Sequence, residues 1–116
     1  MSELHTITVN LDEIRSRAEA VSQIRLNRTT TPEDELRATR YTLERAIDEC
    51  RLAEYALKVE QQKADEALAE AGYEPDDDSA LAQQLTLFRQ YAERFTRRIA
   101  AIDRALEDRR ESTPPP

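Results

Sequence analysis

The stretch that decides the fold is LAQQLTLFRQYAERFTRRIAAIDRAL, residues 81–106. Its apolar side chains recur at alternating spacings of four and three residues, at Leu81, Leu85, Phe88, Ala92, Phe95, Ile99, Ile102 and Leu106. This alternation is typical of a coiled-coil seam, because it keeps one narrow side of a helix apolar. It predicts a helix over residues 79–110 that packs along its length against another helix.

A second long helix is predicted over residues 32–71, because Pro and Gly are absent from position 33 until Gly72. Thr31 fits a helix N-cap, Pro32 the first helical position and Gly72 the position just past the end. About 40 residues would span about 60 Å. Its apolar residues recur every seven positions, at Leu36, Leu43, Cys50, Leu57, Ala64 and Ala71, with further apolar residues beside them at Ala46, Ile47, Ala53, Ala67 and Leu68.

The segment between these helices, residues 72–79, is a turn by composition. A short loop makes two long helices antiparallel neighbours and would pair positions whose numbers add up to about 152. Phe88 would then face Ala64, and Glu60 would lie opposite Ala92 within the seam. We expect the Glu60 carboxylate to reach the edge of the seam, towards Arg89 or Arg97.

The N-terminal third adds a shorter helix. Asn10 fits an N-cap and Glu13 closes a capping box, so a helix is predicted over residues 11–27 with an apolar face of Leu11, Ile14, Ala18, Val21 and Ile24. Residues 1–10 are expected to form an extended arm and residues 112–116 a flexible Pro-rich tail. The predicted fold is therefore all-α: a long antiparallel, coiled-coil-like helical hairpin with a shorter N-terminal helix packed on it, in one domain over residues 11–111.

Charge is divided unevenly between the two long helices. Residues 29–72 carry 11 acidic and 6 basic side chains, whereas residues 80–111 carry 5 acidic and 7 basic ones. The net charge of −7 argues against direct binding to nucleic acid or to an anionic membrane. There is neither a membrane-spanning stretch nor a signal-peptide pattern, so we expect a cytoplasmic protein.

Residues that usually carry catalysis are scarce. The sole glycine lies in the turn, which excludes a Gly-rich phosphate loop, and the sole histidine, His5, lies on the N-terminal arm. A catalytic triad or a His-containing metal site cannot be built within the chain. Cys50 falls on the seam and is most simply a small core residue. We therefore expect no catalytic residues, no cofactor, no metal and no small-molecule substrate.

The informative feature is a surplus of apolar side chains outside the seam. Leu52, Tyr55 and Val59 lie on the opposite side of their helix from Cys50, while Leu87 and Tyr91 stand beside the seam of the other helix. Either the N-terminal helix or a partner must cover them. We expect these five residues to form a protein interface.

Three functions are compatible with this pattern. The first is a non-enzymatic interaction or assembly protein that binds itself, as a homodimer or higher oligomer, or another protein. The second is an acidic inhibitor or regulator of the kind encoded by phages, which docks on a host macromolecule. The excess of arginine over lysine, 15 to 2, indicates the codon bias of a GC-rich genome, such as that of an actinobacterium or of a phage that infects one, and does not distinguish these functions. The third is an all-α nucleotide-processing enzyme, although its acidic residues would have to point into the bundle, where the seam offers only Glu60.

Overall fold

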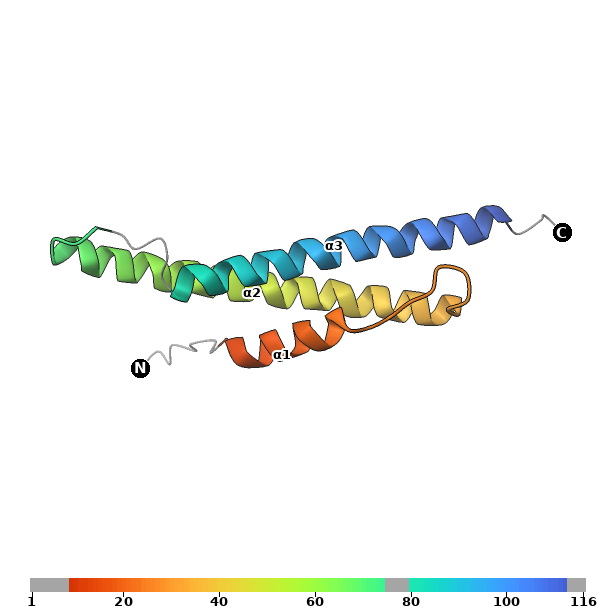
Figure 1. The fold of residues 1–116 in the computed structure, drawn as a ribbon, viewed down its shortest axis with the longest axis horizontal. Coiled ribbons are helices and arrows are strands. Elements are labelled where there is room, and N and C mark those ends of the chain that lie inside the picture. The colour runs from red at the N-terminus through yellow and green to blue at the C-terminus, as the bar shows by residue number, and fades with distance from the viewer. Residues whose placement is uncertain (1–8, 75–79, 113–116) are drawn as a thin grey trace, which may run out of the picture.

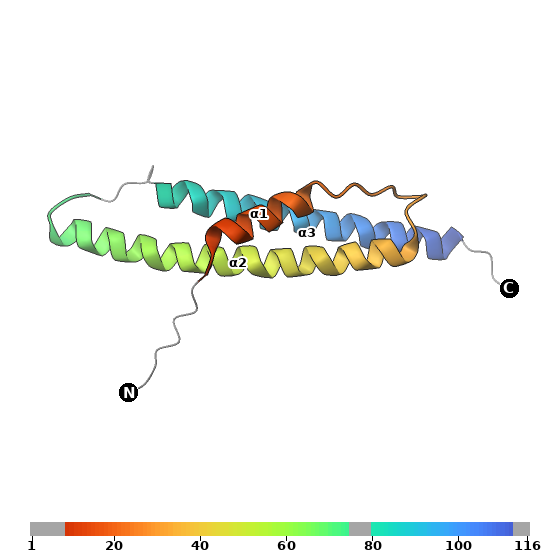
Figure 2. The ribbon, with the colours of Figure 1, turned by 90° about the horizontal axis from the view of Figure 1, so that it is seen from below.

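The computed structural model describes residues 9–74 and 80–112. Three helices make up the described part of the chain: α1 (Leu11–Ser22), α2 (Glu33–Glu70) and α3 (Ala80–Ser112). The two long helices pack against each other in opposite directions (Figure 1), and the shorter α1 contacts both of them, chiefly α2. Figure 2 shows α1 seated along the line where α2 and α3 meet. The predicted all-α hairpin with a shorter N-terminal helix is confirmed.

The core runs along the predicted seams. Phe88 and Phe95 of α3 and Leu36, Leu43 and Leu57 of α2 are almost completely buried. All eight seam positions predicted for α3 are buried or packed against the core. From α1 the core receives Ile14, Ala18 and Val21. Because the seam of each long helix is narrow, α1 supplies the third side of the core.

The register of the hairpin differs from the prediction. Arg89 donates to Glu54 over 2.9 Å and Arg40 to Asp103 over 2.6 Å, so both ion pairs join residues whose numbers add up to 143. The prediction of about 152 is wrong by about nine residues, or about two and a half turns. As a result, the last turns of α2 extend past the start of α3 (Figure 1).

Burial explains why this register is preferred. The end of α2 offers mainly alanine on its seam side, and Ala64, Ala67 and Ala71 are exposed. Alanine buries little apolar area, whereas the middle of α2 offers larger side chains. The observed register places Phe88 and Phe95 of α3 at the level of that middle part. The prediction that Ala64 faces Phe88 is therefore wrong.

The two ends of α2 are built differently from each other. Gly72 adopts the left-handed conformation with φ of 87°, as predicted for the residue past the helix end. The amide of Tyr73 donates to the Leu68 carbonyl over 2.8 Å, and that of Gly72 to Ala69 over 3.0 Å, which completes a Schellman motif. At the start, the prediction of Thr31 as the N-cap is wrong. Pro32 occupies that position without a side-chain cap, and helix α2 begins at Glu33.

The connection between α1 and α2 is longer than predicted. Asn10 caps α1 by accepting from the Glu13 amide over 3.1 Å, as expected, but α1 ends at Ser22 rather than near residue 27. The side-chain oxygen of Asn27 accepts hydrogen bonds from the backbone amides of Thr29 and Thr30, and the backbone amide of Asn27 donates to the Thr31 hydroxyl. These bonds hold residues 27–31 in a turn, because an Asn side chain competes with helical backbone bonding.

Residues 1–8 of the predicted arm, residues 75–79 of the predicted turn and residues 113–116 of the predicted tail lie outside the described residues.

Candidate functional site

Three exposed large apolar side chains lie on α2. Leu52 is 45% exposed and Tyr55 is 67% exposed, while Val59 is half-buried. Tyr41, at 60% exposure, lies three turns before Leu52 and therefore on the same side of the helix. The exposed Asp48 lies between Tyr41 and Leu52 on this side, so we call Leu52, Tyr55 and Val59 the α2 stripe. Neither α1 nor α3 covers Leu52 or Tyr55, so of the two alternatives the structure excludes coverage of these two residues by α1.

The geometry of α2 explains this exposure. One side of the helix carries Cys50, Ala53 and Leu57, which are buried against the other helices. Residues two or five positions away from Cys50 point to the opposite side, because each residue turns the helix by about 100°. That opposite side carries Leu52 and Tyr55. Since α1 and α3 both pack on the seam side, nothing in the described chain remains to cover it.

The other two residues of the predicted interface, Leu87 and Tyr91, lie on a different surface. Both are half-buried on α3. Leu87 lines a small hollow together with Leu11 and Arg15, beside the start of α1. Tyr91 stacks on Phe95 with ring centroids 5.8 Å apart and belongs to the margin of the core. The structure therefore separates Leu87 and Tyr91 from the α2 stripe.

A buried acidic residue lies on the side of α2 that faces α3. The side chain of Glu54 is 9% exposed and binds three basic side chains: Arg89 at 2.9 Å, Arg51 at 3.1 Å and Lys58 at 3.4 Å. Burial raises the pKa of Glu54, but the hydrogen bonds from these cations outweigh burial, so the net pKa lies below its usual value. Three cations around one carboxylate leave an excess of positive charge beside the α2 stripe.

Glu54 is a residue that the sequence reasoning missed. The acid predicted to lie at the seam, Glu60, is exposed and lies 3.8 Å from Lys63, so the expectation that it reaches Arg89 or Arg97 is wrong. Glu54 lies four residues after Cys50 and three before Leu57, which is the spacing of a side chain at the edge of the seam. That spacing was the available signal.

Just before the stripe, the charge has the opposite sign. Asp48 is exposed and on the same side of α2 as Leu52, and among the described residues it has no ion-pair partner. The cation-rich group around Glu54 lies on the other side of Leu52 along the helix. The exposed face of α2 thus runs from an unpaired carboxylate through apolar side chains to an excess of basic side chains.

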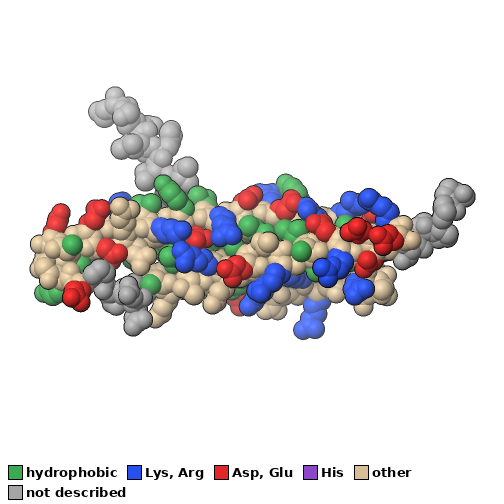
Figure 3. All heavy atoms as spheres, turned by 90° about the horizontal axis from the view of Figure 1, so that it is seen from above, with side chains coloured by type: hydrophobic (Ala, Val, Ile, Leu, Met, Phe, Trp, Pro, Cys, Tyr) green, Lys and Arg blue, Asp and Glu red, His purple; other side chains and the backbone are tan. Residues whose placement is uncertain are grey.

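Over the face viewed in Figure 3, opposite to that of Figure 2, acidic and basic side chains are interspersed along the length of the molecule. Elsewhere on the molecule, charged side chains form ion pairs between helices, such as Arg17 with Glu49 at 2.9 Å, which joins α1 to α2. Exposed pairs of this kind contribute only tenths of a kcal/mol each. We read this face as ordinary charged surface.

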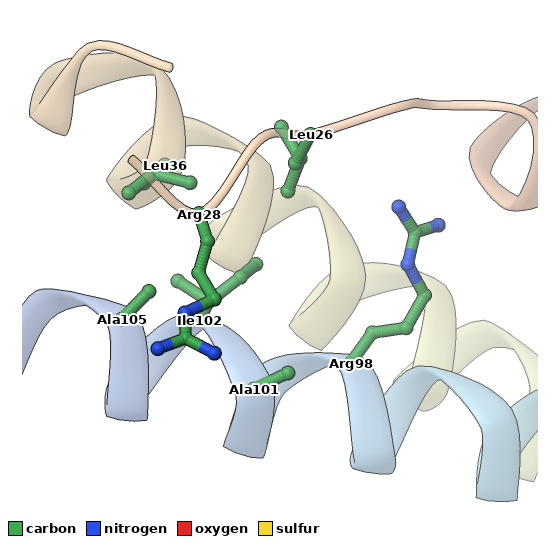
Figure 4. A pocket seen from close by; sticks show the side chains of 7 residues that line it. All are labelled: Leu26, Arg28, Leu36, Arg98, Ala101, Ile102 and Ala105. Atoms are coloured by element: carbon green, nitrogen blue, oxygen red, sulfur yellow. The ribbon is translucent and has the colours of Figure 1, made fainter. Parts of the chain in front are cut away.

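A cavity of about 280 Å³ lies beneath the connection between α1 and α2. Figure 4 shows Leu26 on the connection above it and Ala101, Ile102 and Ala105 on α3 below it; Leu36, Arg28 and Arg98 complete the lining. The Arg98 guanidinium donates to the carbonyls of Val21, over 3.0 Å, and Ile24. Arg98 therefore satisfies carbonyl groups at the end of α1 and ties α1 to α3.

In the described parts of the chain, no group of three or more His, Cys, Asp or Glu side chains is arranged to hold a metal ion. Within the same residues, no helix combines the length and the apolar character that crossing a bilayer requires. The Cys50 thiol is fully buried, and burial raises its pKa to about 11.

No protein-family model, no curated protein and no solved structure matches the chain. The α2 stripe and the charges beside it are therefore the features of the chain that indicate a function.

Proposed function

We propose that this chain is a non-enzymatic, cytoplasmic interaction protein that assembles with a second copy of itself through the α2 stripe. The observation that carries the proposal is the exposure of Leu52 and Tyr55, at 45% and 67%, on the side of α2 that no other helix packs against. Tyrosine with an adjacent aliphatic side chain is a common centre of a protein interface.

The rest of the exposed surface supports the same choice. A contiguous exposed apolar surface on a helix usually marks a contact site, because its hydration is unfavourable. The stripe extends from Leu52 to Val59, about 10 Å or two turns along the axis, and its three side chains lie next to one another on one side of α2. Glu54, the one buried acidic side chain among the described residues, is already bound to three cations and holds the hairpin together.

The test is Tyr55→Asp combined with Val59→Asp. Charge forced into the centre of the interface should convert an oligomer into a monomer, because an unpaired carboxylate is costly to bury. The hairpin should stay folded, because Tyr55 does not belong to the core. Light scattering measures the mass, and a thermal melt measures stability.

Tyr73→Asp is the matched control. Tyr73 is 68% exposed but lies past the end of α2 and outside the stripe, so this variant should associate like the wild type. A wild-type chain that stays monomeric at high concentration would exclude self-association. A double variant that loses its stability instead of its partner would show that the stripe is covered within the same chain.

A further inference from the structure

We infer that two copies pair through α2 in antiparallel orientation about a twofold axis level with residue 53, so that Asp48 of each copy binds Lys58 of the other. This inference rests on the proposed function, because it specifies the partner geometry of the same stripe. Three observations lead to it: the exposed apolar centre, the unpaired carboxylate on one side of it and the excess of cations on the other.

Asp48 and Lys58 lie on either side of the apolar centre of α2. Asp48 and Lys58 lie about 15 Å apart on α2, and their midpoint is level with Ala53. Leu52 and Tyr55 straddle this midpoint. An antiparallel copy centred there places Leu52 against Tyr55 of the partner copy, and Tyr55 against its Leu52. The apolar centre is therefore complementary to itself, as an interface with twofold symmetry requires.

The charges of Asp48 and Lys58 favour the antiparallel orientation of the two α2 helices. In the antiparallel arrangement, the unpaired Asp48 of one copy meets the other copy at Lys58, where Arg51 and Lys58 exceed the single negative charge of Glu54. A parallel arrangement in the same register would place Asp48 beside its own equivalent and Lys58 beside its own. Like charges facing each other oppose association, so electrostatics selects the antiparallel orientation.

The packing of the hairpin leaves room for this arrangement. The ion pair of Arg17 with Glu49 and the bond from Arg89 to Glu54 show that α1 and α3 approach α2 from the seam side. Leu52 and Tyr55 point away from both. A second hairpin can therefore lie against α2 without displacing either helix, and the pair forms a layer with the two α2 helices at its centre.

Charge reversal tests this geometry. Asp48→Lys and Lys58→Asp should each raise the dissociation constant of the homodimer by about tenfold, because each change turns two attractions into repulsions. Mixing the two variants should restore association at the wild-type level, since every Asp48–Lys58 position then joins opposite charges. The double variant, with both residues exchanged, should also form a homodimer like the wild type.

Glu93→Lys is the control for net charge. Glu93 is exposed on α3, so its reversal should leave the dimer unchanged. Analytical ultracentrifugation measures all dissociation constants, and a thermal melt of Lys58→Asp checks that losing the contact with Glu54 leaves the hairpin folded.

The outcomes separate this inference from the proposed function. The proposed function stands if the wild type dimerises and Tyr55→Asp with Val59→Asp prevents dimerisation. In that case, a mixture of the two charge variants that fails to associate overturns the antiparallel register alone. A monomeric wild type overturns both.

Discussion

A matched pair of substitutions on α2 tests the register of the hairpin. Ala53 and Ala64 are both alanines on the side predicted to form the seam, but Ala53 is fully buried and Ala64 is exposed. We expect Ala53→Glu to lower the free energy of unfolding by at least about 3 kcal/mol, because it combines overpacking with a buried carboxylate. We expect Ala64→Glu to change it by less than about 0.5 kcal/mol.

The two variants differ mainly in the burial of the substituted residue. Both replace Ala by Glu within one helix, so the small difference in helix propensity cancels. A loss of 3 kcal/mol should lower the melting temperature by at least about 12 °C, at about 4 °C per kcal/mol for a domain of this size. Circular dichroism during thermal and urea unfolding measures both quantities.

If Ala53→Glu does not fold, Ala53→Leu and Ala64→Leu provide a milder pair. Overpacking at Ala53 should cost about 1–3 kcal/mol, whereas the same change at Ala64 should be close to neutral. Equal losses at the two positions would refute the reasoning, because they would show that the end of α2 is covered to the same extent as its middle. Negligible losses at both positions would show that Ala53 does not lie in the core.

Three further predictions concern single side chains. Burial raises the pKa of Cys50 to about 11, so its reaction with a thiol reagent at pH 8 should be at least tenfold slower in the native protein than in denaturant. The pKa of Glu54 is lower in the folded protein than its ordinary value of 4.5. The contribution of Glu54 to the free energy of unfolding is therefore fully present at pH values above 4.5 and is lost as the pH falls through the lower folded-state pKa. Glu54→Gln should remove that part of the acid sensitivity of the melting temperature and cost about 1 kcal/mol at pH 7, through the loss of the ion pair with Arg89. Arg98→Ala should weaken the protection of α1 amides in hydrogen exchange by on the order of 1–3 kcal/mol, whereas the exposed Arg94→Ala should not change it.

The sequence specified much of the candidate surface as well as the helices. The spacing of Leu52, Tyr55 and Val59 relative to Cys50 places them away from the seam, and the structure leaves Leu52 and Tyr55 exposed there. This succeeded because the direction of a side chain on a straight helix follows from its residue number alone. Leu87 could not be assigned in the same way, since it borders the start of α1, and Tyr91 stacks on Phe95 at the margin of the core.

What the sequence by itself determined was which residues form the long helices and which side of each is apolar, because caps, glycine and periodicity are local signals. Only the tertiary structure decided how far α3 slides along α2, since a shift of a turn or two still presents apolar side chains of α3 to the same side of α2. The position is fixed by contacts between residues distant in the chain, such as Phe88 with the middle of α2 and Arg89 with Glu54. The end of α1 was decided in the same way: its last carbonyls are bound by Arg98, from a helix that begins more than fifty residues later.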